Sequence, residues 1–104
     1  MWYLNTLLIM KNFLVMFELY NPEKDYTRIV NRIIDSYPEH IKLFKFNWIL
    51  KSDNTRYEII NNLAKVIDNE GVFIVIELDS LHPSLWTTRG VSTAINNWLI
   101  KHLS

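Results

Sequence analysis

One carboxylate stands out in this sequence, because it lies at the end of an apolar, strand-like run and directly ahead of a turn. Residues 13–20 are rich in β-branched and aromatic side chains, and Asn21-Pro22 ends the run. Carboxylate oxygens are the ligands that hard divalent cations such as Mg²⁺ prefer in proteins. Glu18 is therefore our candidate for both a catalytic residue and a metal ligand. The alternative is a solvated carboxylate, or one paired with Lys51 on a neighbouring strand.

A second carboxylate is not expected beside Glu18 within one chain. The strand that holds Glu77 is predicted to run antiparallel to the strand of Glu18, which places Glu18 across from about Phe73 and Glu77 near the far end. General acid–base catalysis by these two residues is therefore not expected. In a symmetric dimer, however, two copies of Glu18 could approach each other across the axis.

Several cations could contact a phosphate. Arg28 follows Asp25 in the first turns of a predicted helix, where the pair either meets a ligand or forms a local ion pair. Lysines around Trp48 resemble a basic and aromatic surface for single-stranded nucleic acid. Trp48 shares its strand parity with apolar neighbours, which favours a core position instead. The candidates for nucleic-acid contacts are Arg28, Lys45 and Lys51.

Composition excludes several classes of site. There are no cysteines, so disulfides and thiolate chemistry are absent, and the three histidines lack the spacing of a zinc site. Two glycines cannot build a phosphate-cradling loop, and no organic cofactor is expected. A net charge of zero weighs against extended nucleic-acid binding by a monomer.

The first ten residues are apolar but do not predict a membrane segment. Lys11, Asn12 and Glu18 interrupt the apolar span well before the length that a spanning helix needs. A signal peptide would need a basic region before the apolar stretch and a small-residue cleavage site, and neither is present. We expect an N-terminal extension over residues 1–10, a single domain over residues 11–104, and a cytoplasmic location without membrane contact.

Hydrophobic periodicity predicts the elements that position these residues. Apolar residues at helical spacing and a terminal Pro38 indicate the first helix, while Thr55 and Glu58 form a capping box for the second, which we expect to close at Gly71. A change of phase near residues 43–45 indicates two short strands or one bent strand. The predicted segments are strands over 13–20, 40–52 and 72–79, and helices over 22–37, 55–70 and 91–103.

This order of elements predicts an α+β fold, a ferredoxin-like β-α-β-β-α-β sandwich with an additional C-terminal helix. The near-continuous apolar strand 72–79 is typical of a central or twice-covered position. We expect its Val72, Ile74 and Ile76 side chains to face the helices. The opposite, mixed face of the sheet would still expose apolar side chains, which predicts a homodimer with sheets face to face. The dimer-face candidates are Leu14, Met16, Ile49, Phe73 and Val75.

Several short motifs, taken together, resemble one protein family. FELYNP followed by EKDY resembles the "YDLNxPxxDY" opening of small bacterial proteins of the SinR group. The likeness continues through NWILKSDN and VIDNEGVFIVIEL, and ends at Leu85-Trp86-Thr87 and Asn97-Trp98-Leu99. These proteins are relatives of the second CRISPR-associated adaptation protein, with VapD-type ribonucleases as further kin. The resemblance covers the chain from about Lys11 onward.

The resemblance implies a ferredoxin-like homodimer. In the nuclease members, an aspartate at the end of the first strand supports metal-dependent phosphodiester cleavage at the dimer axis. Glu18 occupies that position here, with one more methylene, and the basic residues that follow in many nucleases are replaced by Tyr20, Asn21 and Glu23.

Two hypotheses follow for the function. The first is a dimeric, Mg²⁺-dependent endonuclease that acts on RNA rather than DNA, with Glu18 of each protomer at the axis. The second is a catalytically inactive binding module of the same fold, an antitoxin or a scaffold whose protein partner belongs to a defence or toxin–antitoxin complex.

Overall fold

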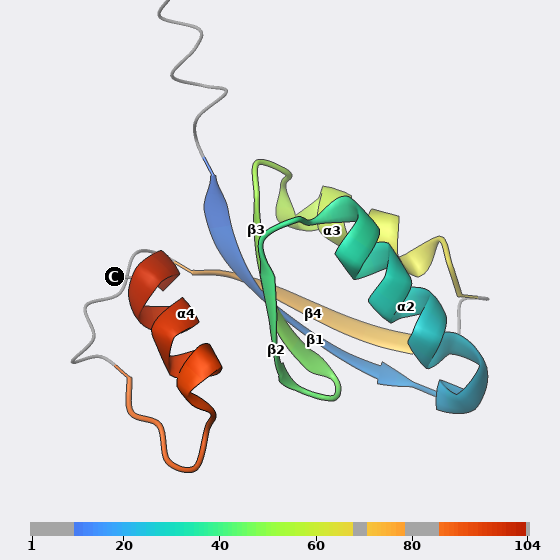
Figure 1. Ribbon diagram of the computed structural model, residues 1–104. Coiled ribbons are helices and arrows are strands. Elements are labelled where there is room, and N and C mark those ends of the chain that lie inside the picture. The colour runs from blue at the N-terminus through green and yellow to red at the C-terminus, as the bar shows by residue number, and fades with distance from the viewer. Residues whose placement is uncertain (1–9, 68–70, 79–85, 104) are drawn as a thin grey trace, which may run out of the picture.

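The computed structural model describes residues 10–67, 71–78 and 86–103. The predicted extension lies outside these residues except for Met10, and so do His82 and Leu85. The chain folds in the order β-α-β-β-α-β-α (Figure 1). The elements are β1 (Lys11–Leu19), α2 (Pro22–Ser36), β2 (His40–Phe44), β3 (Asn47–Ser52), α3 (Arg56–Ala64), β4 (Gly71–Leu78) and α4 (Thr93–Leu103).

The four strands form one antiparallel sheet in the order β2-β3-β1-β4. Both connections through α2 and α3 skip one strand, which is the split arrangement of a ferredoxin-like sandwich. The predicted α+β fold with an additional C-terminal helix is therefore confirmed. β1 lies in the interior of the sheet between β3 and β4, so the strand that carries Glu18 is held on both sides.

Local sequence signals explain where the two first helices begin. Pro22 occupies the first turn of α2, where its missing N–H costs nothing, although Asn21 makes no side-chain cap. α3 begins with the predicted capping box: the Thr55 hydroxyl accepts from the Glu58 N–H, and the Glu58 carboxylate accepts from the Thr55 N–H. The predicted end of this helix at Gly71 is wrong, because α3 ends at Ala64 and Gly71 is the first residue of β4.

The second β-rich region forms a hairpin of β2 and β3, and an irregular register explains the change of phase in its sequence pattern. β2 and β3 pair antiparallel, and the register shifts between Lys42 and Phe44. Trp48 then points into the core with 4% of its surface exposed, and its indole N–H donates to the Lys45 carbonyl. Trp48 therefore lies in the core, as its place in the alternating pattern of the strand predicts.

α2 and α3 cover one face of the sheet and enclose the main core. Odd-numbered residues of β1 point into it, together with residues of both helices and of β3. The fully buried members are Phe13, Val15, Ile29, Ile33, Leu50, Ile59 and Leu63. Tyr37 caps α2 and joins the two helices, since its hydroxyl donates to Asn54 and accepts from Asn62. Burial raises the pKa of the Tyr37 hydroxyl.

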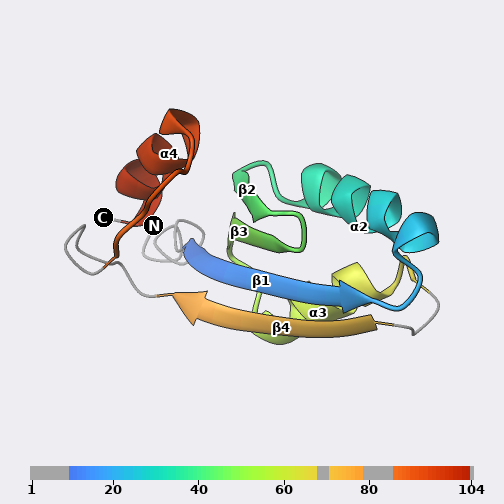
Figure 2. The same cartoon turned by 90° about the horizontal axis from the view of Figure 1, so that it is seen from below.

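α4 packs against the other face of the sheet and builds a second, smaller cluster. In both views it lies away from α2 and α3, beside the start of β1 (Figures 1 and 2). Leu99 and Leu103 of α4 are buried against Ile49, with Leu14 and Leu78 packed around them. α4 therefore covers the half of this face that lies near the beginning of β1 and the end of β4.

The predicted faces of β4 are reversed in the structure. Phe73 pairs with Phe17 and Val75 with Val15, so both pack against the main core under the helices. The Phe17 and Phe73 rings lie 6.2 Å apart between centroids. Phe73 and Val75 are therefore wrong as dimer-face residues. The reason is the register: a side chain paired with a core residue of β1 must point to the core as well.

Two further expectations about the sheet are corrected. β4 is an edge strand rather than a central one, since it pairs only with β1. Ile49 is only 3% exposed and Leu14 is partly buried, because α4 covers both. Leu14 and Ile49 are therefore not accessible to a partner. Of the five dimer-face candidates, Met16 alone lies on the part of this face that α4 does not cover.

Candidate functional site

Glu18 lies at the end of β1 on the face opposite α2 and α3. It is exposed and pairs with Val72 across the β1–β4 ladder. Its side chain borders a shallow hollow of about 200 Å³ lined by Met16, Phe17, Glu18, Val72 and Ile74. The position at the strand's end, beside a turn, agrees with the sequence prediction.

Gly71 lets the start of β4 lie close to the backbone of Glu18. A Cβ atom at Gly71 would stand 3.3 Å from the Glu18 carbonyl oxygen and 2.9 Å from the Ile67 side chain. The Ile67 methyl group can move, but the Glu18 carbonyl belongs to a paired strand. The absence of a side chain at Gly71 therefore helps to fix the backbone that carries the candidate carboxylate.

Beside Glu18 lies an open apolar patch, which we define as Met16, Val72, Ile74 and Ile76. The three β4 side chains are 46%, 50% and 43% exposed. They alternate along β4 and stand opposite Glu18, Met16 and Leu14 of β1, so they share one face. The open patch begins where the cover of α4 ends, and Glu18 lies at its far border.

No ion pair involves Glu18 within the described part of the chain. Lys51, its suggested partner, stands opposite Asn12 at the other end of β1. Glu77 stands opposite Phe13, as far from Glu18 as predicted, and its carboxylate lies 3.7 Å from Lys11 and 3.9 Å from Arg56. Glu18 is therefore the one accessible carboxylate that the described residues place at this site.

The described residues do not gather a cluster of metal ligands around Glu18. Among residues 10–67, 71–78 and 86–103, no three acidic or histidine side chains come together as a metal site. Mg²⁺ keeps most of its waters and is commonly held by one or two carboxylates together with substrate phosphates. Two Glu18 side chains at a two-fold axis would supply two such carboxylates, whereas the described residues of one chain supply one.

The three candidate nucleic-acid contacts do not form one surface. Arg28 borders a groove between α2 and α3, and its guanidinium lies 3.8 Å from the buried Asp25 carboxylate, so the predicted local ion pair is present. Lys45 lies over the Tyr26 and Phe46 rings at the β2–β3 turn, at 5.1 and 5.4 Å from their centroids. Lys51 belongs to β3 near α4.

A polar junction between α4 and the sheet was not anticipated from the sequence. The Asn12 side-chain amide donates to the His102 carbonyl over 3.0 Å, and His102 Nδ1 lies 3.6 Å from Glu39. The His102 ring stacks on Trp98 with centroids 4.2 Å apart. Burial lowers the pKa of His102, with Lys51 acting in the same direction. Asn12, Glu39 and His102 are far apart in the sequence, and no spacing signal connects them, whereas Trp98 and His102 lie one helical turn apart.

Comparison of the sequence with models of protein families and with curated proteins gives no match. None of the helices in the described ranges has the length and apolar character needed to cross a membrane. The candidate site therefore stands on the fold and on its own geometry.

Proposed function

We propose that this protein is a homodimeric, Mg²⁺-dependent endoribonuclease in which Glu18 of each protomer meets at the dimer axis. One observation supports this above all others: the uncovered apolar part of the second sheet face borders Glu18. A partner that buries the open patch must approach the half of the face where Glu18 lies, because α4 already occupies the other half.

Burial of apolar surface provides the free energy for such a dimer. Val72, Ile74 and Ile76 are each about half exposed, and removal of apolar surface from water contributes roughly 25 cal/mol per Å². An isologous contact pairs the same patch of both copies around a two-fold axis. A carboxylate at the border of that patch is then repeated across the axis.

The paired carboxylates would hold one Mg²⁺ through charge and oxygen donors. When bound, the ion supplies charge stabilisation for a phosphodiester and activates a water molecule. Glu18 contributes an accessible carboxylate near the end of β1, where its backbone pairs with Val72 of β4. RNA is the proposed substrate, in agreement with the nuclease members that the sequence resembles, and we place the protein in the cytoplasm.

The second candidate function is a binding module without catalysis, acting as an antitoxin or a scaffold. The single carboxylate per protomer favours it, as do the uncharged Tyr20 and Asn21 that directly follow β1. In this version the open patch serves assembly, with a second copy or with a protein partner from a defence or toxin–antitoxin complex.

Cleavage assays with a conservative variant test the proposal. Labelled RNA and DNA are incubated with Mg²⁺ or with EDTA, using the wild type, Glu18→Gln and the control Glu23→Gln in the neighbouring helix turn. We expect Mg²⁺-dependent RNA cleavage that falls at least 100-fold in Glu18→Gln and is unchanged in Glu23→Gln. Cleavage that survives Glu18→Gln eliminates the mechanism, and no cleavage of any substrate favours the binding module.

The dimer is tested separately by sedimentation. The wild type should sediment at twice the 12.5 kDa chain mass, and Ile74→Ser should shift it to the chain mass without unfolding it. Thr27→Ser, on the exposed side of α2, is the matched control and should remain dimeric. A wild type that sediments as a monomer at micromolar concentration contradicts the paired site.

A further inference from the structure

A groove borders α2 and the end of α3, on the face of the sheet opposite Glu18. Its volume is about 410 Å³, and it is lined by Arg28, Asn31, Arg32, Asp35 and Val66. Four of these residues belong to α2, and Val66 follows the end of α3. The groove is therefore distinct from the site proposed for Glu18, because the whole sheet separates the two.

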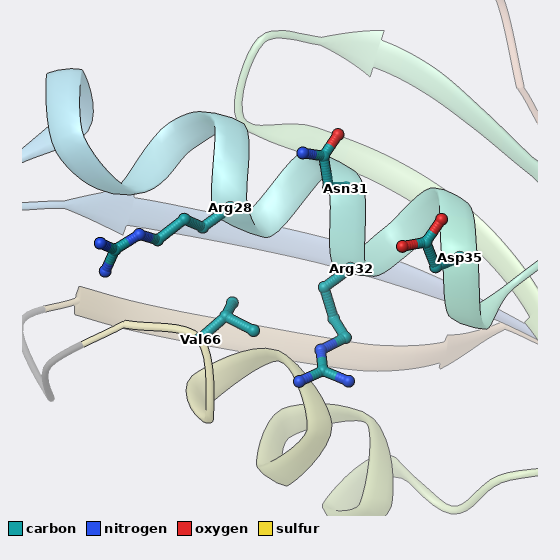
Figure 3. A pocket seen from close by; sticks show the side chains of 5 residues that line it. All are labelled: Arg28, Asn31, Arg32, Asp35 and Val66. Atoms are coloured by element: carbon teal, nitrogen blue, oxygen red, sulfur yellow. The ribbon is translucent and has the colours of Figure 1, made fainter.

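Two arginines of α2 border this groove: the Arg32 side chain extends toward α3, and the Arg28 side chain runs along α2 toward the start of that helix (Figure 3). Arg28 and Arg32 are four residues apart, which places them on the same side of the helix. Figure 3 shows their side chains on either side of Val66, whereas Asn31 and Asp35 point away from α3. The groove thus presents two guanidinium groups around a small apolar surface.

The charges around the groove leave Arg32 available. Within the ranges that the structure describes, no carboxylate lies within ion-pair distance of Arg32, while Arg28 is held at 3.8 Å by Asp25. Besides burial, the charge of Glu58 in α3 raises the pKa of Tyr37, whereas that of Arg32 lowers it. The Glu58 carboxylate accepts the capping hydrogen bond from the Thr55 N–H over 2.8 Å. Asp35 is the one acid that lines the groove.

Asp25 gives Arg28 a fixed position. Its carboxylate is buried, with 3% of the side chain exposed, and Oδ1 has no hydrogen-bond partner among the described residues. The Arg28 side chain is half exposed, so it can contact both Asp25 and a ligand in the groove. Asp25 thus orients Arg28 beside Arg32, which has no carboxylate partner among the described residues, and guanidinium groups are well suited to bind phosphate oxygens.

We propose that the groove between α2 and α3 binds the phosphate group of a nucleotide or of an RNA strand, with Arg28 and Arg32 as its ligands. The planar guanidinium matches phosphate oxygens in a bidentate geometry, which a lysine cannot reproduce. The groove is open along one side, so a phosphate within a chain could enter as well as a terminal one. Val66 supplies an apolar contact for the attached sugar or base.

This proposal does not depend on the Glu18 site. A phosphate held in the groove lies on the helical face and cannot reach a carboxylate on the opposite face of the same protomer. The groove is therefore a binding site rather than a place of cleavage. If Glu18 has no catalytic role, the two arginines would still bind a phosphate.

Binding measurements with matched variants test the groove. Dissociation constants are measured at low salt for 5′-AMP and for a fluorescent 12-nucleotide single-stranded RNA, with wild type, Arg32→Gln, Arg32→Lys and Lys65→Gln. Lys65 follows α3, is exposed and does not line the groove. We expect Arg32→Gln to weaken binding about tenfold, because a charge-assisted bidentate contact is lost. Arg32→Lys should weaken it several-fold, and Lys65→Gln less than twofold.

Each outcome decides the proposal. Binding of 5′-AMP identifies a site for a single phosphate ester, and binding of the RNA alone identifies a site for a polynucleotide; both support the groove if Arg32→Gln reduces them. Equal losses in Arg32→Gln and Lys65→Gln would reveal general electrostatic attraction and overturn the proposal, as would the absence of binding to both probes. Glu18→Gln should leave both dissociation constants unchanged, and thermal unfolding of Arg32→Gln serves to exclude loss of folding.

Discussion

The two faces of the sheet are made from alternate residues of the same strands, yet they differ in how completely they are covered. Odd-numbered residues of β1 lie under α2 and α3 in a closed core. Even-numbered residues lie on the opposite face, where α4 covers Leu14 and Ile49 but leaves the open patch exposed. The first face provides stability, whereas the second combines apolar surface with the exposed Glu18 carboxylate.

This difference predicts that substitutions on the two faces have different effects. A residue in the closed core is fixed by many neighbours, and its substitution acts on the whole domain. A residue of the open patch has solvent on one side, so its substitution should change stability less than a substitution in the closed core. α4 stands between these extremes, since it buries a small cluster at one end of the open face.

The largest effect is expected from truncation in the closed core. Leu63→Ala removes a fully buried side chain of α3 and should lower the free energy of unfolding by about 2–5 kcal/mol. Chemical denaturation followed by circular dichroism measures the change. Tyr57→Ala, in the same helix but 69% exposed, is the control and should change stability by less than about 1 kcal/mol. A loss for Leu63→Ala as small as that of the control would contradict a closed core.

A smaller and more local effect is expected for the same change in α4. Leu99→Ala should cost about 2 kcal/mol at most, because its cluster is small and lies at the edge of the fold. Hydrogen exchange should accelerate in α4 while the amides of β1 and α3 keep their protection. Equal acceleration in all elements would mean that α4 and the closed core unfold as one unit.

The smallest effect concerns the junction that attaches α4 to the sheet. The pKa of His102 is lowered in the folded state, chiefly by burial, from an unfolded value near 6.5. The unfolded chain therefore binds the proton more readily, and the free energy of unfolding should decrease as the pH falls through about 6.5. Lys51 and Lys101 oppose the protonated ring, and Glu39 favours it.

Denaturation of wild type and His102→Gln at pH 7.5 and pH 5.5 measures this contribution. We expect the wild type to lose more stability between the two pH values than the variant does. Asn12 bonds the backbone of His102 and not its ring, so the variant keeps that hydrogen bond. An identical loss in both proteins would contradict a role for His102 in the pH dependence.

Much of the fold could be predicted because its signals are local. The capping box of Thr55 and Glu58, the apolar stripe of α2 and the phase change before Phe46 each need only a few neighbouring residues. Alternation in β1 identified the buried face correctly. The position of Glu18 at the end of β1 also follows from the turn at Asn21-Pro22 alone.

The faces of β4 could not be predicted in the same way. Both of its alternating sets are largely apolar, so composition did not decide which one the helices cover, and the wholly apolar set was assigned to the core. In the structure the pairing of Phe73 with Phe17 decides it. Register between strands that are far apart in the sequence is a tertiary property. The same holds for the cover that α4 gives to Ile49.

The order of the elements, the buried side of β1 and the position of an accessible carboxylate at its end can be predicted from the sequence alone. The reason is that periodicity, capping and turn residues act over short distances. The tertiary structure adds that β4 is an edge strand, that α4 leaves the open patch beside Glu18 uncovered, and that Arg28 and Arg32 border one groove beside α3. These features depend on which surfaces meet, and the packing of distant elements settles that question.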